Sequence, residues 1–217
     1  MSNLDFQAMR RAMVDSQLRT NAVNDPRVTA VIETVAREAF VPADRQAMAY
    51  VDRAVPLAGG RALNPPLVTA RLIVEAGIAA DDKVLVVGAA SGYAAAIVAG
   101  LAAHVVALES DAGLAGAAKA QLKSLTNVTV VMGDLAKGHA KGAPYDVILV
   151  DGVIGHIPDA LVRQLADKGR LAAAVAQDGV SRLCVGYKSG DAFGLSPVMD
   201  ADAVVLPGFD QPRGFTF

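Results

Sequence analysis

The stretch that decides the fold is residues 83–93, KVLVVGAASGY. Its first half is a short apolar run, typical of a strand buried on both faces. Its second half is a turn of small residues that opens an alanine-rich helix. A ligand can approach the backbone of such a strand–loop–helix unit, because glycine leaves room and the helix start carries free N–H groups. The loop alone is a weak signal, since an ordinary tight turn has the same composition.

The chain after this stretch alternates between helical segments and short apolar runs. We expect helices over 93–103, 111–125 and 158–169, and strands over 82–87, 104–109, 127–134, 145–151 and 170–176. Strands that alternate with helices predict an α/β fold with a mostly parallel, doubly wound sheet. From Val180 onward we expect further strands and loops.

The chain before this stretch is mainly helical. Residues 5–20 form an amphipathic pattern, and a second helix is expected from Pro26 with Asp25 as its N-cap. A Gly/Pro-rich loop over 50–66 leads into a third helix that stops at Gly77. The sequence therefore divides into an N-terminal helical extension with its loop (1–79) and a sheet-containing core (80–217), packed as one compact unit.

No charged residue occurs between Val84 and Leu108, a run long enough to cross a bilayer. Three features oppose that interpretation. Glycines and His104 interrupt the run, its period changes from strand to helix to strand, and Lys and Arg do not gather at either end. We expect a buried strand, helix and strand, and no membrane span.

Composition narrows the class of protein. The formal net charge is −2 over 217 residues, so the chain lacks the excess of positive charge that is typical of nucleic-acid-binding proteins. Cys184 is the only cysteine, so no internal disulfide can form; with an N-terminus that lacks a signal peptide, this indicates the cytoplasm. Cys184 lies in a strand-like segment, which favours a buried inert thiol over a nucleophile. The three histidines have no metal-ligand spacing, so we expect no metal site.

Two carboxylates support a ligand site at the end of the sheet. Glu109 ends the second strand, 21 positions after Gly88, and Asp134 ends the third. The carboxyl ends of parallel strands share one edge, where a carboxylate can accept hydrogen bonds from both ribose hydroxyls. Each residue alone could be a solvated strand end or a turn residue. Together they favour a ligand that bears a nucleoside, and both NAD and S-adenosylmethionine fit.

Over nearly its whole length the chain resembles the protein-L-isoaspartate O-methyltransferases. The resemblance rests on motifs in matching order and spacing: MVDSQLRTNAVNDPRV (13–28), REAFVP (37–42), AYVDRAVPLAGGRALNPPLVTA (49–70), KVLVVGAASGYAAAIVA (83–99), NVTVVMGD (127–134), GAPYDVILV (142–150) and QLADKGRLAAAV (164–175). The tail LPGFDQPRGFTF (206–217) is similar to that of an α-proteobacterial subgroup.

The resemblance implies a Rossmann-like class I methyltransferase. It would methylate the carboxylate of isoaspartyl residues in damaged proteins, with S-adenosylmethionine as donor. The cytoplasm and the absence of a metal are expected from the residues as given above, and a monomer is the default expectation. The resemblance also implies site residues. The donor would be bound by Gly88, Ala89, Ala90, Ser91, Gly92, Glu109, Asp134 and Leu135, the substrate by Gly60, Arg61, Ala62 and Leu63, and Asn64 would take the catalytic position.

The chain departs from the family in the loops that matter most. Asn64 replaces a serine after Gly60-Arg61-Ala62-Leu63, where the family usually has Gly-Gln-Thr-Ile, and Leu135 replaces a glycine. An amide can still donate a hydrogen bond there, although Asn64 could instead be only the N-cap of the helix after Pro65. Ala90 replaces a glycine of the donor loop, and Val86 replaces an acidic residue of the first strand. Each loss would cost about 1 kcal/mol, so donor affinity would fall roughly tenfold to a thousandfold.

Two alternatives to isoaspartyl methylation therefore stay open. One is an impaired or inactive descendant that serves as a binding module, and the other is a methyltransferase with a different acceptor. Three further residues have open roles. Asp151 could face the substrate or be a solvated strand end, and Asp52 and Arg53 could line the acceptor site or lie on the surface.

Overall fold

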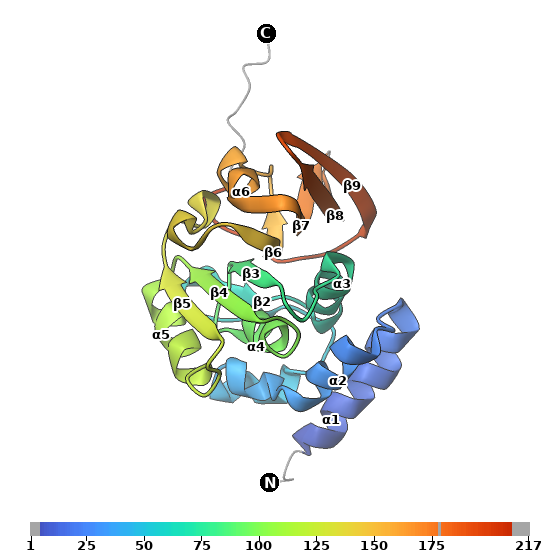
Figure 1. Ribbon diagram of the computed structural model, residues 1–217. Helices are drawn as coiled ribbons and strands as arrows, with labels where there is room; N and C mark the ends of the chain where they lie inside the picture. The colour runs from blue at the N-terminus through green and yellow to red at the C-terminus, as the bar shows by residue number, and fades with distance from the viewer. Residues whose placement is uncertain (1–4, 178, 210–217) are drawn as a thin grey trace.

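The computed structural model describes residues 5–177 and 179–209, which form one twisted sheet flanked by helices on both faces (Figure 1). The strand order in this seven-stranded sheet is β5-β4-β3-β6-β7-β8-β9. Its strands are β3 (Lys83–Val87), β4 (His104–Glu109), β5 (Val128–Met132), β6 (Tyr145–Ile154), β7 (Leu165–Gln177), β8 (Val180–Ser189) and β9 (Ala192–Asp200). The ladders from β5 to β7 are parallel, while β8 and β9 pair antiparallel. The expected mostly parallel, doubly wound sheet is confirmed.

The helices follow the sequence signals closely. They are α1 (Phe6–Met13), α2 (Pro26–Thr34), α3 (Pro66–Ala76), α4 (Tyr93–Ala99), α5 (Ala112–Gln121) and α6 (Asp159–Gln164). A π-helical turn (Val14–Leu18) and a 3-10 turn (Arg19–Asn21) extend α1. Asp25 caps α2 by accepting a hydrogen bond from the Arg27 N–H, and Gly77 ends α3 in the left-handed conformation. Further 3-10 turns are Arg37–Phe40, Ala43–Met48, Ala58–Gly60, Leu135–Lys137 and Ala140–Gly142.

The three helices expected after β3 all end before their sequence patterns do. The first ends at Ala99 instead of 103, and the second ends at Gln121 instead of 125. The third was expected over 158–169, but α6 ends at Gln164, and Leu165 already pairs with Tyr145 of β6. The apolar side chain of Leu165 is buried. Its burial and its pairing with β6 outweigh the helix propensity of the local sequence.

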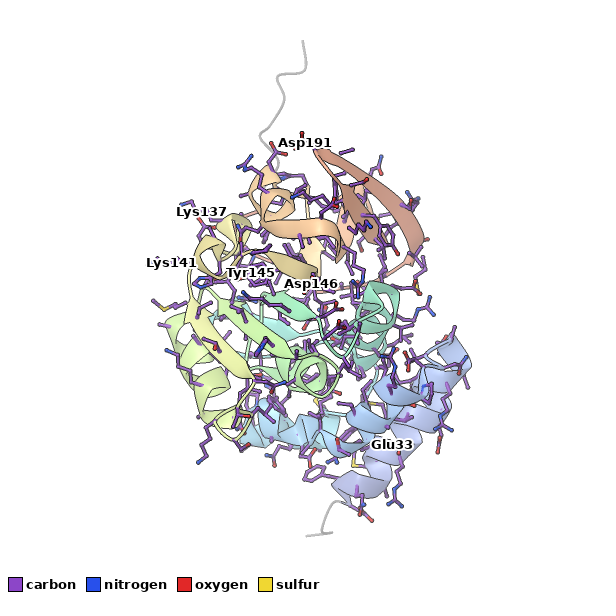
Figure 2. All side chains as sticks on the ribbon, viewed as in Figure 1. Glu33, Lys137, Lys141, Tyr145, Asp146 and Asp191 are labelled. Carbon is purple, nitrogen blue, oxygen red and sulfur yellow. The ribbon has the colours of Figure 1, made fainter. Side chains whose placement is uncertain are left out.

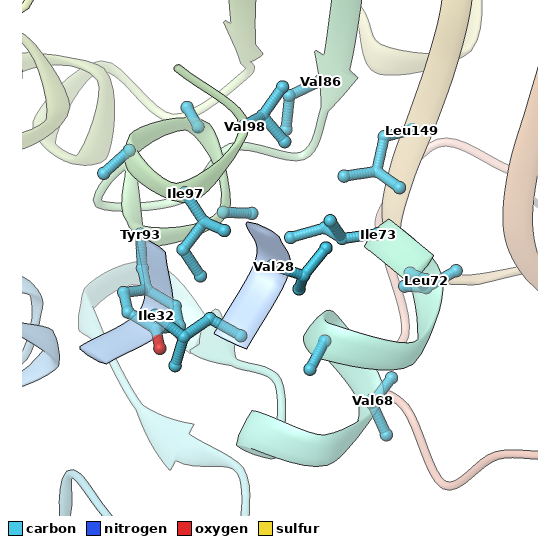
Figure 3. Close-up of a cluster of buried hydrophobic side chains, with 14 of the residues drawn as sticks. Val28, Ile32, Val68, Leu72, Ile73, Val86, Tyr93, Ile97, Val98 and Leu149 are labelled. Atoms are coloured by element: carbon cyan, nitrogen blue, oxygen red, sulfur yellow. The ribbon is translucent and has the colours of Figure 1, made fainter. Parts of the chain in front are cut away.

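The uncharged run forms β3, the donor loop (Gly88–Gly92), α4 and β4, and nearly all of it is buried. Among the described residues no helix combines the length and the apolar character needed to span a bilayer. Side chains of β3 alternate between two cores. Val86 packs with Ile97, Ile73 and Leu149 in the core between the sheet and the N-terminal helices (Figure 3). Leu85 faces the second core, under α6.

The N-terminal extension is tied to the donor loop by a buried arginine. Arg37 is 0% exposed; its Nε donates to the Ala49 carbonyl (2.7 Å), and its Nη2 donates to the Asn64 carbonyl (2.6 Å). Its guanidinium carbon lies 4.5 Å from the centre of the Tyr93 ring, at the start of α4. The hydroxyl of Ser91 donates to the Phe40 carbonyl (2.6 Å). The first 80 residues therefore help to fix the shape of the donor loop.

A C-terminal segment, Val204–Phe209, follows β9 and returns across the end of β6. The Val153 N–H donates to the Val204 carbonyl (2.7 Å), and the Leu206 N–H donates to the Val153 carbonyl (2.9 Å). Leu206 and Phe209 are buried in the second core. We call residues 204–209 the closing segment. The rest of the LPGF…F tail, residues 210–217, lies outside the described residues.

Candidate functional site

The donor loop uses its backbone N–H groups internally. Gly88 and Ala89 both donate to the Leu108 carbonyl (3.0 Å each), Ala90 donates to Oε2 of Glu109 (2.7 Å), and Gly92 donates to the Ala89 carbonyl (2.8 Å). The N–H groups of these four loop residues are therefore satisfied within the protein, because β4 and the loop itself supply their acceptors. Gly88 and Gly92 adopt φ values of +78° and +104°, which favour glycine, and their lack of a Cβ lets Leu206 and Leu122 approach the loop closely.

Ala90, also of the donor loop, has an unusual backbone for an alanine. Its φ is +49°, in the left-handed region where a Cβ costs about 1–2 kcal/mol. The residue is 2% exposed, and its hydrogen bond to Glu109 holds the backbone in place. A glycine would adopt this conformation freely, which explains in physical terms why glycine suits this position.

Glu109 is the centre of the site and is not a solvated strand end. It is 0% exposed at the end of β4. Its Oε1 accepts from the backbone N–H groups of Ser110 (2.8 Å) and Asp111 (3.0 Å) and from Nη1 of Arg61 (2.5 Å). Arg61 is itself only 7% exposed, so the pair is a buried ion pair. The carboxylate expected to bind ribose is held by an arginine from the expected substrate loop.

A cavity of about 360 Å³ lies next to Glu109 at the same edge of the sheet. It is lined by Ser110, Asp134, Leu135, Ala136, Lys137, Pro207 and Gly208. Leu135 is buried, whereas the Asp134 side chain is 47% exposed and accepts from the Ala136 N–H (3.1 Å). Lys137 pairs with Asp134 (3.1 Å) and lies at the outer margin of the molecule (Figure 2). The structure thus brings Asp134 and Leu135 together beside Glu109.

The expected substrate loop turns inward after its glycines. Gly60 is exposed with φ +71°, and a Cβ there would meet open space. Leu63, in the short strand β2 (Ala62–Leu63) that pairs with β1 (Val55–Pro56), is 2% exposed, whereas Ala62 is half-buried. Of these loop residues, Gly60 is therefore the one that lies on the surface.

Asn64 is buried and both ends of its amide are bonded. Its Nδ2 donates to Oδ1 (2.8 Å) and to the carbonyl (2.9 Å) of Asp151, and its Oδ1 accepts from the Val204 N–H (2.7 Å). The N-cap interpretation of Asn64 is wrong: Pro65 takes the N-cap position of α3, with no side-chain hydrogen bond. Its side chain links β6 to the closing segment instead.

Asp151 faces this polar cluster, so the alternative of a solvated strand end is wrong. It is 6% exposed and accepts from Asn64 and from the Thr69 hydroxyl (3.0 Å). Burial raises the pKa of the Asp151 carboxyl, and these hydrogen bonds and the charge of Arg37 oppose that shift. Thr69, Arg37 and Leu206 are site neighbours that sequence reasoning missed. All three lie in motifs that the family resemblance covers, but no residue type or spacing there pointed to a role in the site.

The other candidates lie apart from the Glu109 cluster. Asp52 accepts from the Leu67 N–H (3.2 Å), and exposed Arg53 lines a cavity of about 330 Å³ with Asp52 and Asp202. Cys184 is buried in β8, and burial raises the pKa of its thiol, as in an inert cysteine. Within residues 5–177 and 179–209, no three His, Cys, Asp or Glu side chains are grouped to hold a metal.

Comparisons with known proteins agree with this architecture. The family described as Protein-L-isoaspartate(D-aspartate) O-methyltransferase (PCMT) matches residues 8–204. A protein-L-isoaspartate O-methyltransferase of Koribacter versatilis (strain Ellin345) is 38% identical over 94% of this chain and 92% of its own. One of Methylorubrum populi (strain ATCC BAA-705 / NCIMB 13946 / BJ001) is 39% identical over 79% of this chain and 82% of its own.

Two solved structures share the fold. One, a protein-L-isoaspartate O-methyltransferase, has a TM-score of 0.80 and 21% identity, over 92% of this chain and 66% of that chain. The other is a putative PCMT from Plasmodium falciparum in complex with S-adenosyl-L-homocysteine, with a TM-score of 0.78 and 16% identity over 93% and 98% of the two chains. From the family match over most of its length and the identity to these relatives, the chain belongs to the protein-L-isoaspartate O-methyltransferase family.

Proposed function

We propose that this chain transfers a methyl group from S-adenosylmethionine to the side-chain carboxylate of L-isoaspartyl residues in damaged proteins. Family membership supports the proposal, and one observation carries it. The donor loop, Glu109 and the cavity bounded by Asp134 and Leu135 lie together at the carboxyl edge of one parallel sheet. Ligands of open α/β sheets bind at this edge.

The chemical types of the residues at this edge are those that bind S-adenosylmethionine: a glycine, a carboxylate and apolar side chains. Gly88 lacks a Cβ at this edge, and Glu109 is a carboxylate that supplies acceptors for ribose hydroxyls once Arg61 has left it. The 360 Å³ cavity has an apolar wall at Leu135 and Pro207, which suits a purine ring. We therefore assign donor binding to Gly88–Gly92, Glu109, Asp134 and Leu135.

The chemistry requires positioning rather than a general base. When bound, S-adenosylmethionine supplies a methyl group on a sulfonium, which an ionised carboxylate can attack as its carbon–sulfur bond breaks. The protein's part is to hold the two partners in line and to exclude water. We assign the acceptor side to the loop Gly60–Leu63 and to Asn64, within the unit formed by the extension (1–79) and the core (80–217).

The test is methyl transfer from labelled S-adenosylmethionine to an isoaspartyl peptide, beside an aspartyl peptide of the same sequence. We expect label on the isoaspartyl peptide only, and a raised KM for the donor in Glu109→Gln. Asp159→Asn, at an exposed position of α6, is the matched control and should behave as the wild type. Equal labelling of both peptides, or none, would refute the proposal.

The buried state of Glu109 favours a second candidate, a family member that binds partners without turnover. A carboxylate with no exposed surface and an arginine on it is closed to ribose in this arrangement. A different acceptor gains no support from Arg61, because that side chain points to Glu109. The same assay separates these candidates, since any turnover on the isoaspartyl peptide removes the inactive one.

A further inference from the structure

Leu206 of the closing segment lies directly on the donor loop. A Cβ on Gly88 would be 2.8 Å from both Cδ1 and Cδ2 of Leu206. A Cβ on Gly152 of β6 would be 2.6 Å from Cγ of Leu206 and 2.6 Å from the Val204 carbonyl oxygen. The space that two glycines leave open at the carboxyl edge is therefore filled by the chain's own leucine, which is 4% exposed.

Arg61 covers the neighbouring part of the same site. Its Nη1 lies 2.5 Å from Oε1 of Glu109, and its Nε is a buried donor for which no acceptor is found. An unpaired buried donor costs about 1–3 kcal/mol, so the closed position of Arg61 is not fully satisfied. Moving Arg61 away from Glu109 therefore costs less free energy than moving an arginine whose donors are all bonded.

Asn64 fastens the closing segment to the rest of the site. Its Oδ1 accepts from the Val204 N–H (2.7 Å), while its Nδ2 donates to Asp151. Arg61 and Asn64 are also two of the positions at which the chain departs from the family's usual substrate loop. Both departures make contacts that close the donor edge.

The closing segment makes fewer backbone contacts than a strand of the sheet. It makes one isolated bridge, between Val153 and Val205, and two backbone hydrogen bonds to Val153. Val205 is 73% exposed. Next to the segment the cavity at Asp134 and Leu135 stays open, with Pro207 and Gly208 as one wall. Movement of these few residues would join that cavity to Gly88 and Glu109.

We propose that Val204–Gly208 and Arg61 form an internal plug, which must leave Gly88 and Glu109 before S-adenosylmethionine binds. The inference rests on the proposed function, because it assumes that this edge is the donor site. A closed state lowers the apparent affinity for the donor by the fraction of molecules that are open. Donor binding and release of the closing segment are therefore coupled.

The experiment is a calorimetric titration with S-adenosylhomocysteine of the wild type, Leu206→Ala and the matched control Leu195→Ala, at an exposed position of β9 outside the plug. Circular dichroism establishes first that each variant is folded. We expect Leu206→Ala to bind roughly tenfold more tightly than the wild type, about 1.4 kcal/mol, and Leu195→Ala to bind as the wild type does. Equal or weaker binding by folded Leu206→Ala would overturn the plug.

Hydrogen exchange of the unmutated chain gives a second test. The amides of Val153, Val204 and Leu206 are all donors to the closing contacts. With saturating S-adenosylhomocysteine, the peptides that carry them should exchange faster, although most of the molecule becomes more protected. Slower or unchanged exchange at all three would also overturn the plug.

The titration and the methyl-transfer assay together distinguish failure of the plug from failure of the proposed function. Tighter binding by Leu206→Ala without transfer to the isoaspartyl peptide would support the plug and refute the proposed acceptor. Transfer by the wild type, with no gain in affinity for Leu206→Ala, would refute the plug and leave the proposed function intact. Absence of binding in all three proteins would refute both.

Discussion

At the scale of single residues, Asp151 makes the stability of the fold depend on pH. Burial raises the pKa of its carboxyl above the ordinary 3.8, against the hydrogen bonds from Asn64 and Thr69 and the charges of Arg37 and Arg61. The folded chain therefore binds this proton more tightly than the unfolded chain. The stabilisation from Asp151 is complete at or below its unfolded pKa, and it is lost as the pH rises through the higher folded pKa.

Asp151→Asn should remove this dependence, because an amide carries no titrating proton and its oxygen can still accept from Asn64 and Thr69. Urea unfolding at roughly pH 3.5, 5 and 7 would measure it. We expect the variant to gain stability relative to the wild type as the pH rises. Asp159→Asn, exposed on α6, should show no such gain. Parallel curves for wild type and Asp151→Asn would contradict the prediction.

At the scale of elements, α5 contains a glycine with no structural need for one. Gly116 is exposed in the helix, and a Cβ there would meet nothing within 4 Å. Gly116→Ala should raise the free energy of unfolding by about 0.5–1 kcal/mol, because alanine favours helix. Gly113→Ala should gain less, because its Cβ would lie 3.2 Å from Oδ1 of Asp111, the N-cap oxygen. Urea midpoints of the two variants compare them directly.

The contact between α3 and β7 depends on one arginine. Arg170 donates through Nε to the Ala76 carbonyl and through Nη2 to the Gly77 carbonyl and to Asp82 (2.6 Å), and the side chain is 17% exposed. Arg170→Leu should cost about 2–4 kcal/mol, since it removes the donor to two helix-end carbonyls and leaves the Asp82 carboxylate with no cationic partner and only the Ala79 N–H as donor to Oδ2.

The control for Arg170 is an arginine of the same sheet with an exposed partner. Arg182 pairs with Asp200 at 3.2 Å, and their side chains are 43% and 74% exposed. Arg182→Leu should therefore cost less than about 1 kcal/mol. Thermal melts of both variants compare the two losses of stability. Equal losses would show that the burial of the ion pair does not determine its contribution to stability.

The elements were predictable from the sequence, whereas the closed state of the site was not. The donor loop, Glu109 at the end of β4, the N-cap of α2 and the end of α3 at Gly77 each follow from a few adjacent residues. The pair Arg61–Glu109 joins positions 48 residues apart, and the bond from Val204 to Asn64 joins positions 140 apart. No local pattern encodes such contacts, because they depend on how β6, the substrate loop and the closing segment meet.

At the scale of the whole molecule, the extension and the core should unfold together. Arg37 spans from Ala49 to the ring of Tyr93, and Phe40 packs edge-on against that ring at 5.7 Å. The chain has no tryptophan, so its four tyrosines report tertiary structure. We expect urea transitions followed by tyrosine fluorescence and by far-ultraviolet circular dichroism to coincide. Two separate midpoints would show that residues 1–79 unfold on their own.

The sheet order also has a consequence for synthesis on the ribosome. Strand β3, apolar from Val84 to Val87, lies between β4, which follows soon after it, and β6, which begins only at Tyr145. In a nascent chain that has reached only β5, one edge of Val84–Val87 therefore has no strand of this sheet to pair with. Exposed apolar edges pair with other chains, so we expect this edge to favour aggregation until β6 has been made.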